Sequence, residues 1–125
     1  MQLSVYLKEH PLKAWRLRVA SGGRCENCSN EFPVIILGIH IIGTPPDIGA
    51  DVIDLQKYLL VLCPACHRSL RSGRVEESLQ RELVRHRSGR VRKRMREILG
   101  YRPRNYVPPG DFDPAVIFQE MVNSG

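Results

Sequence analysis

Two matched cysteine pairs, Cys25-Glu-Asn-Cys28 and Cys63-Pro-Ala-Cys66, decide the fold of this sequence, and a histidine, His67, follows the second pair directly. Two residues between cysteines let one tight turn direct both sulfurs at a single ion, and two such turns supply the four thiolates of a closed tetrahedral zinc site. The 34 residues between the pairs predict a folded segment whose ends are held together by a structural Zn²⁺. Two disulfides, four unrelated thiols, or iron in place of zinc are the alternatives.

The cellular setting follows from the same cysteines. Disulfides are typical of secreted chains, but the N-terminal segment lacks the basic start and long apolar stretch of a signal peptide. The longest apolar run, Val34 to Ile42, is interrupted by Gly38 and His40 and is far shorter than the roughly 20 residues that span a bilayer. We therefore expect the reducing cytoplasm and no membrane partner.

The charge of the chain is concentrated in one segment. The 125 residues carry a formal net charge of +6, yet the segment 85–104 holds nine basic residues and a single acid, Glu97. The nine are Arg85, Arg87, Arg90, Arg92, Lys93, Arg94, Arg96, Arg102 and Arg104. A solvated helix face is the ordinary interpretation of a charge run, but so focused a block favours a polyanion. We expect these residues to bind nucleic acid, with DNA favoured over RNA and little sequence specificity, because no base-reading motif is visible.

The first 73 residues divide into two predicted segments. Residues 1–22 form a helical lead-in, with a helix that begins near Pro11. Residues 23–73 form the zinc-bound module. Within it, the β-branched run from 32 to 42 predicts one or two strands of a hairpin. Pro64 favours the start of a helix that Gly73 ends.

The remaining residues predict a helical extension. Residues 74–104 form a basic helical arm with a weak point at Ser88-Gly89, and residues 105–125 form a tail whose short helix begins after Asp113. The apolar side of that helix, residues 114–122, is a candidate surface for a protein partner. The predicted fold class is therefore α+β: a small zinc-stapled module between an N-terminal helix and a C-terminal basic helical extension.

The order strand, histidine, loop, short strand, Cys-x-x-Cys-His and helix resembles the HNH endonuclease family, whose module is also called the ββα-metal finger. The resemblance runs from about Trp15 to Gly73, and its most specific part is the closing motif Val61-Leu-Cys-Pro-Ala-Cys-His67. It implies an ββα fold and a catalytic divalent ion such as Mg²⁺ or Mn²⁺. In the family, two adjacent strand residues supply an ion ligand and a general base, an asparagine orients the base, and the final histidine is another ligand. Transferred to this chain, the resemblance makes His40 and His67 the candidate catalytic residues, with His67 a ligand of that ion.

The chain departs from the family pattern around His40. If His40 is the base, Ile39 stands in the ligand position, and if His40 is the ligand, Ile41 stands in the base position. The asparagine position is taken by Tyr58, or by Gln56 in a shifted register. An isoleucine can neither bind the ion nor accept a proton, so the cleavage centre is expected to be impaired or lost. A carboxylate from the intervening loop could replace the missing ligand; the three there are Asp47, Asp51 and Asp54.

Three functions are therefore compatible with the sequence. The first is a zinc-stabilised HNH-fold nucleic-acid-binding protein whose cleavage centre is impaired. The second is a working endonuclease with an atypical ligand set. The third is a subunit of a larger nucleoprotein assembly that docks through residues 114–122.

Overall fold

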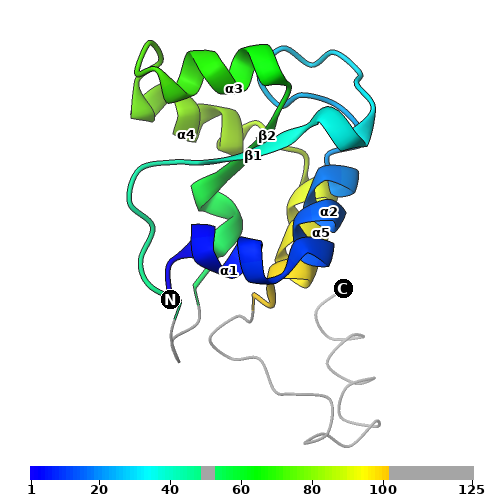
Figure 1. The fold of residues 1–125 in the computed structure, drawn as a ribbon, viewed down its shortest axis with the longest axis vertical. Helices are drawn as coiled ribbons and strands as arrows, with labels where there is room; N and C mark the ends of the chain where they lie inside the picture. Colours follow the sequence, from blue (N-terminus) through cyan, green and yellow to red (C-terminus); the bar gives the residue numbers. More distant parts are fainter. Residues whose placement is uncertain (49–52, 102–125) are drawn as a thin grey trace, which may run out of the picture.

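A computed structural model of the chain describes residues 1–48 and 53–101. A two-stranded antiparallel sheet lies at its centre, formed by β1 (Gly38–Ile41) and β2 (Leu59–Leu62). In the register of the pair, Gly38 lies opposite Leu62 and His40 lies opposite Leu60. Helices α3 and α4 lie on one side of this hairpin, and α1, α2 and α5 lie on the other (Figure 1). The described chain is thus a mixed helix-and-sheet fold, as predicted.

Two helices precede the first cysteine pair. Helix α1 spans Leu3–Glu9 and α2 spans Pro11–Ala20, with Pro11 in the first position of α2, where a missing N–H costs no hydrogen bond. The predicted start of a helix near Pro11 is confirmed, whereas α1 was not predicted. Gly22 and Gly23 then adopt positive φ angles of 76° and 71°, which favour glycine, and they turn the chain into the first cysteine pair.

The run from 32 to 42 contains one strand rather than two. Residues Val34–Ile36 form a 3₁₀ helix, η1, and only Gly38–Ile41 pairs with β2. The register explains the difference. Continuing the ladder before Gly38 would require partners after Leu62, but the chain there enters α3 (Pro64–Arg71). Gly73 follows α3 with a φ of 79°, so the predicted bounds of this helix are confirmed.

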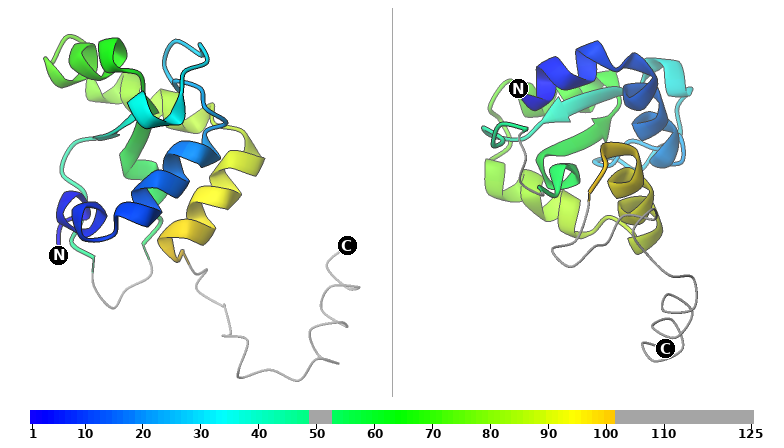
Figure 2. Two further views of the ribbon diagram at one scale, coloured as in Figure 1. Left: turned by 45° about the vertical axis from the view of Figure 1, so that its right-hand side comes forward. Right: turned by 90° about the horizontal axis from the view of Figure 1, so that it is seen from below.

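The predicted basic arm is two helices packed on the rest of the molecule. Helix α4 spans Glu77–Arg85 and α5 spans Gly89–Leu99, and the break falls at the predicted weak point, where the Ser88 hydroxyl caps α5 by accepting from the backbone N–H of Val91 at 3.2 Å. Both views of Figure 2 place α5 beside α2, and α4 packs against β2. The tail 105–125, with the predicted helix 114–122, lies outside the described residues.

The core lies between the hairpin and its helices. All four residues of β2 have side chains with no exposed area, and Leu17, Ile42 and Met95 reach them from α2, β1's end and α5. Burying each such side chain contributes about 1.5–3 kcal/mol. The 3₁₀ helix η2 (Leu55–Tyr58) leads directly into β2 and packs against α5.

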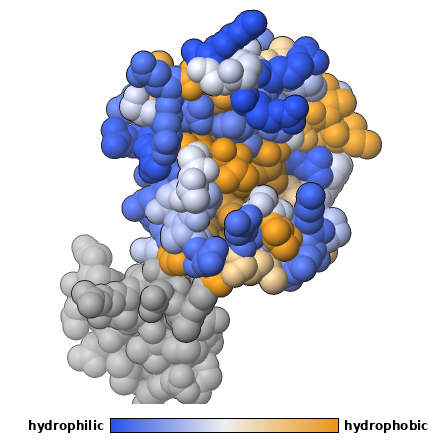
Figure 3. Space-filling view, turned by 60° about the vertical axis from the view of Figure 1, so that its left-hand side comes forward, coloured by the Kyte–Doolittle hydropathy of each residue, from blue (hydrophilic) through white to orange (hydrophobic). Residues whose placement is uncertain are grey.

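Some large apolar side chains remain on the surface. Figure 3 shows apolar areas on one face among hydrophilic neighbours. The exposed apolar residues of α1, α2 and η1 are Val5, Leu12, Trp15, Val19, Ile35 and Ile36. None of the helices in the described ranges combines the length and apolarity that crossing a bilayer requires.

Candidate functional site

The four cysteines come together as the sequence predicted. Cys25 and Cys28 belong to the turn after α2, Cys63 lies between β2 and α3, and Cys66 lies in the first turn of α3. Their sulfurs all lie within 4.8 Å of one another, and all four are free thiols. Four sulfurs around a zinc ion at about 2.3 Å would be about 3.8 Å apart. A small contraction of this cluster would therefore hold a metal ion such as zinc.

The thiols of the cluster differ in acidity. Burial acts to raise the pKa of Cys25, but hydrogen bonds from the backbone N–H groups of Cys28, Cys63 and Asn27 outweigh it and lower the pKa to about 7. Burial raises the pKa of Cys66 to about 12, and the sulfurs of Cys63 and Cys25 add to the rise. A thiolate at Cys25 is therefore available near neutral pH, and metal binding would expel the proton of Cys66.

An internal ion pair fixes the first cysteine pair to the distant helices. The guanidinium of Arg87, between α4 and α5, donates from Nε and Nη2 to the two carboxylate oxygens of Glu26 at 2.7 and 2.8 Å. The same guanidinium donates to the backbone carbonyls of Gln56 and Leu59, at 2.9 and 2.8 Å. Glu26 also bonds Val61 through both its carboxylate and its backbone. The Arg87 side chain is only 1% exposed and that of Glu26 10%, so both charges are buried but fully bonded.

That position corrects one sequence-based expectation. Arg87 was expected to contact nucleic acid, because it belongs to the basic run. Its guanidinium is instead buried. A buried guanidinium is stable only when acceptors satisfy its five N–H groups, and here a carboxylate and carbonyl oxygens do so. Sequence reasoning missed this role because nothing in the local pattern distinguishes Arg87 from its exposed neighbours.

His40 and His67 lie on the same side of the hairpin. His67 projects from α3 and His40 from β1, and their ring centroids are 5.6 Å apart in an edge-on arrangement. A Cβ atom at Gly38 would lie 3.1 Å from Nδ1 of His67, so glycine at this position leaves room for the imidazole. Burial lowers the pKa of His67, and the neighbouring His40 and Arg71 lower it further. His67 is therefore neutral near pH 7.

Gln80 of α4 completes this group, which we call the histidine face (Gly38, His40, His67 and Gln80). Gln80 donates from its amide nitrogen to the carbonyl of Val75 at 3.0 Å, and its amide oxygen lies 2.9 Å from Nε2 of His40. With the amide fixed in this way, its oxygen accepts, so Nε2 of His40 carries the proton. In that state Nε2 has no lone pair for an ion or for a water proton, and Nδ1 is the ring nitrogen that keeps one. Sequence reasoning missed Gln80, which is 40 residues from His40.

The isoleucines beside His40 point the other way. Ile39 and Ile41 line a shallow apolar hollow together with Leu7 and Ala14 of the first two helices. Because successive strand residues face opposite sides, neither isoleucine position can place a side chain beside His67.

Two other candidate positions of the cleavage centre, Asp54 and Gln56, are engaged elsewhere. The Asp54 carboxylate accepts from Arg96 at 2.7 Å and from the Gln56 amide at 3.1 Å. Gln56 is only 1% exposed, and its side-chain amide forms hydrogen bonds with Asp54 and Arg87. Asp51 lies outside the described residues.

The remaining predicted basic residues differ in their surroundings. Arg90, Lys93 and Arg94 are exposed on α5, with Arg94 3.6 Å from Glu97. Arg85 pairs with Glu82 at 3.3 Å, and the hydrogen bond that Arg96 donates to Asp54 raises the pKa of Arg96. Arg102 and Arg104 lie outside the described residues.

Comparisons with protein-family models, with curated proteins and with solved structures each found no match for this chain. The resemblance to HNH endonucleases therefore stays a hypothesis that rests on the residues and the geometry of this molecule alone.

Proposed function

We propose that this protein is a zinc-stabilised nucleic-acid-binding protein of the HNH type that has lost efficient phosphodiester cleavage. The observation that carries the proposal is the surface of α5. Its eleven residues include five basic residues and one acid. Three of the basic residues are exposed: Arg90, Lys93 and Arg94. Cations gathered on one exposed helix face attract the phosphates of a polyanion.

The shape beside this helix supports the same partner. A groove of about 690 Å³ runs between α2 and α5, and the three exposed cations line it with Val19 and Ala20. Phosphates would meet the basic side, while the apolar wall would contact sugars or bases. The described residues offer no base-reading motif, so binding is mostly electrostatic, and DNA is the favoured target.

Zinc is the metal that best suits the cysteine cluster. Four thiolates in a closed, tetrahedral set leave no open position for a substrate, which is the pattern of a structural site. Its role is to hold the turn after α2 to the end of β2, since this small chain has a modest core.

The loss of cleavage is inferred from the histidine face. A metal-dependent nuclease of this type needs an ion ligand and a neutral base that can take a proton from water. Here Nε2 of His40 donates to Gln80, so only Nδ1 of that ring keeps a lone pair, and Ile39 and Ile41 contribute to the apolar hollow on the opposite side instead of supplying a ligand or a base. Removing a general base alone costs about 10²–10⁴-fold in rate.

The binding experiment compares two triple variants of equal charge change. In the test variant Arg90, Lys93 and Arg94 of α5 become glutamine. In the matched control the exposed cations at the end of α3 become glutamine: Arg68, Arg71 and Arg74. Affinity for a duplex DNA is measured at several salt concentrations.

We expect the α5 variant to bind DNA more weakly and to lower the salt slope by roughly two to three, since each lost phosphate contact removes about 0.9 from it. The α3 control should keep most of the DNA affinity and most of the salt slope. Equal losses in the two variants would reduce the proposal to a general charge effect, and affinity insensitive to salt and to both variants would indicate a protein partner instead.

An active endonuclease is the second candidate, because His40 and His67 lie with ring centroids 5.6 Å apart on one side of the hairpin. Plasmid nicking with Mg²⁺ and Mn²⁺ distinguishes the two. Feeble or no cutting by the wild-type chain is expected. Robust cutting that is lost in both His40→Ala and His67→Ala would establish the endonuclease. Docking of residues 114–122 in a larger assembly concerns a segment outside the described residues.

A further inference from the structure

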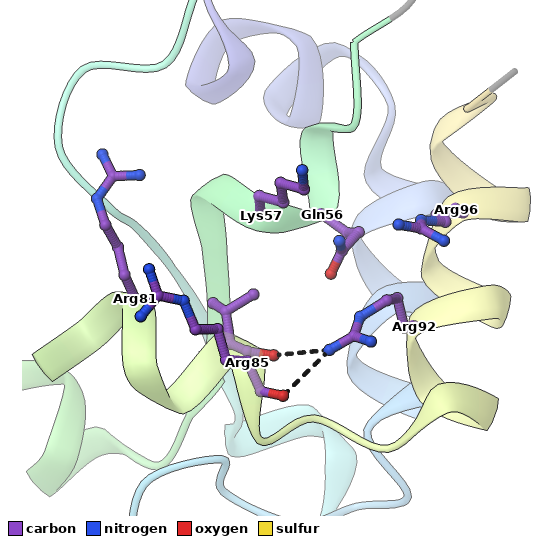
Figure 4. Close-up of a pocket in the computed structure, with 7 residues that line it drawn as sticks. Gln56, Lys57, Arg81, Arg85, Arg92 and Arg96 are labelled. Atoms are coloured by element: carbon purple, nitrogen blue, oxygen red, sulfur yellow. Dashed lines mark hydrogen bonds between the residues drawn. The ribbon is translucent and has the colours of Figure 1, made fainter. Parts of the chain in front are cut away.

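A second basic site lies on a different side of α5. We call it the basic pocket; its lining residues are Gln56, Lys57, Arg81, Val84, Arg85, Arg92 and Arg96. It has a volume of about 400 Å³ and collects cations from three elements, η2, α4 and α5 (Figure 4). Lys57 and Arg81 lie outside the basic run of the sequence, so only the fold brings the five cations together.

The charges of the basic pocket do not cancel. Three cations have carboxylate partners: Arg81 with Glu77 at 2.6 Å, Arg85 with Glu82 at 3.3 Å, and Arg96 with Asp54 at 2.7 Å. Among the described residues, neither Lys57 nor Arg92 has a carboxylate partner. The pocket therefore presents two uncompensated positive charges.

Arg92 is held in a fixed position. Its Nη2 donates to the carbonyls of Val84, Arg85 and Arg87 at the end of α4, at 3.3, 3.2 and 3.3 Å. Figure 4 shows the side chain reaching from α5 toward α4, and its dashed lines mark the hydrogen bonds to the carbonyls of Val84 and Arg85. Within the described ranges its Nε and Nη1 make no hydrogen bond. A guanidinium fixed by one nitrogen, with the three N–H groups of Nε and Nη1 left to donate, is arranged to bind an anion at little entropic cost.

We propose that the basic pocket binds a phosphate monoester, the phosphorylated end of a nucleic-acid strand. A monoester carries close to two negative charges at pH 7, which matches Lys57 and Arg92, whereas an internal phosphodiester carries one. The volume is sufficient for the phosphate and part of its nucleoside. The strand would then continue over the exposed cations of α5. This inference rests on the proposed nucleic-acid binding and names the strand end as its preferred target.

The test measures the binding of short labelled oligonucleotides to the full chain loaded with zinc. The probes are a hydroxyl-ended strand, the same strand with a 5′ or a 3′ phosphate, and a hydroxyl-ended strand two nucleotides longer. The last probe matches the total charge of the phosphorylated strands. We expect a phosphorylated strand to bind about tenfold more tightly than the charge-matched one, equivalent to about 1.4 kcal/mol.

Two variants locate the preference and a third controls for charge. Lys57→Gln removes an exposed cation without internal bonds in the described residues, so it leaves the fold intact, and Arg92→Gln removes the fixed guanidinium. Both should lose the preference for the phosphorylated end. Arg90→Gln, with the same charge change on the other side of α5, should weaken all strands equally and keep the preference.

The outcomes separate the two proposals. Binding without a preference beyond the charge-matched strand overturns the strand-end site and leaves nucleic-acid binding in place. A preference that survives in both Lys57→Gln and Arg92→Gln also overturns it. Failure to bind any strand at low salt overturns both proposals.

Discussion

The cysteine cluster and the histidine face meet at the start of α3, where Cys66 belongs to one and His67 to the other, yet only one of them is complete. Four sulfurs from two distant turns lie within 4.8 Å of one another. The histidine face assembles only two imidazoles, and the amide oxygen of Gln80 accepts a hydrogen bond from one of them at 2.9 Å. The comparison teaches that two adjacent residues of one helix can belong to regions held together in different ways, one by a set of candidate metal ligands and the other by neutral hydrogen bonds.

The same contrast appears in the bonds that surround each region. The cysteine turn is tied by a buried carboxylate to a guanidinium with five donors, whereas the histidine face is tied by single neutral hydrogen bonds. Charge-assisted bonds are roughly twice as strong as neutral ones. Disturbing the cysteine region should therefore cost far more stability than disturbing the histidine face.

The largest effect is expected from losing a metal ligand. Cys63→Ser should prevent residues 24–73 from folding, because structural zinc carries on the order of 10 kcal/mol of binding free energy in small modules. Circular dichroism and elemental analysis check this, with one Zn²⁺ per wild-type chain. Ser72→Ala, an exposed change on the same helix, serves as the control. Two ions per chain would break the comparison, because the histidine face would then also bind metal.

The next largest effect concerns the buried ion pair. Arg87→Met should lower the free energy of unfolding by about 3–5 kcal/mol, because Glu26 would stay buried without a partner. Denaturant unfolding measures the loss, and Arg90→Met on the exposed side of α5 should change stability by no more than about 0.5 kcal/mol.

A double variant sharpens that result. The double variant Glu26→Gln/Arg87→Met should lose less free energy of unfolding than the two single variants lose in sum, because no unpaired charge stays buried in it. Strict additivity would mean that the two groups do not interact in solution, contrary to their 2.7 Å contact.

A smaller effect is expected on the histidine face. Gln80→Leu should cost about 1–3 kcal/mol, because the His40 N–H and the Val75 carbonyl each lose a partner. Zinc content should not change. If Gln80→Leu lowered the free energy of unfolding as much as Arg87→Met does, the histidine face would contribute as much to stability as the cysteine region, contrary to expectation.

The smallest effect should come from the exposed ion pair of the first cysteine turn. Arg24 and Glu31 lie 2.6 Å apart, but their side chains are 56% and 73% exposed. Arg24→Gln should change the free energy of unfolding by about 0–1 kcal/mol, less at high salt. A larger, salt-independent loss would indicate that the contribution of an ion pair to stability depends here on its distance from the cysteine cluster and not on its burial.

Features with a local cause were predictable from the sequence. The spacing of the cysteines predicted their cluster, Pro64 and Gly73 predicted the bounds of α3, and Ser88-Gly89 predicted the break before α5. Each depends on a turn, a cap or a fixed φ angle within a few residues. The extra helix α1 is the exception, since it has no side-chain cap to mark its start.

Features with a distant cause were not predictable. Val34–Ile36 has strand-forming side chains but no strand partner, because β2 ends where α3 begins. Arg87 resembles every other arginine of its run, and contacts with residues 28 to 61 positions earlier bury it. Lys57 and Arg81 join the basic pocket for the same reason.

The Glu26–Arg87 pair also has a consequence for the order in which the chain can fold during synthesis. Both cysteine pairs leave the ribosome before residue 87, so a metal ion can be bound while the Glu26 carboxylate still faces water. Contacts between residues so far apart form late, because a long loop must close first. A chain that terminates between residues 73 and 87 would contain all four cysteines, but its Glu26 carboxylate would have no guanidinium partner. Such a fragment should be difficult to isolate and easily degraded by proteases.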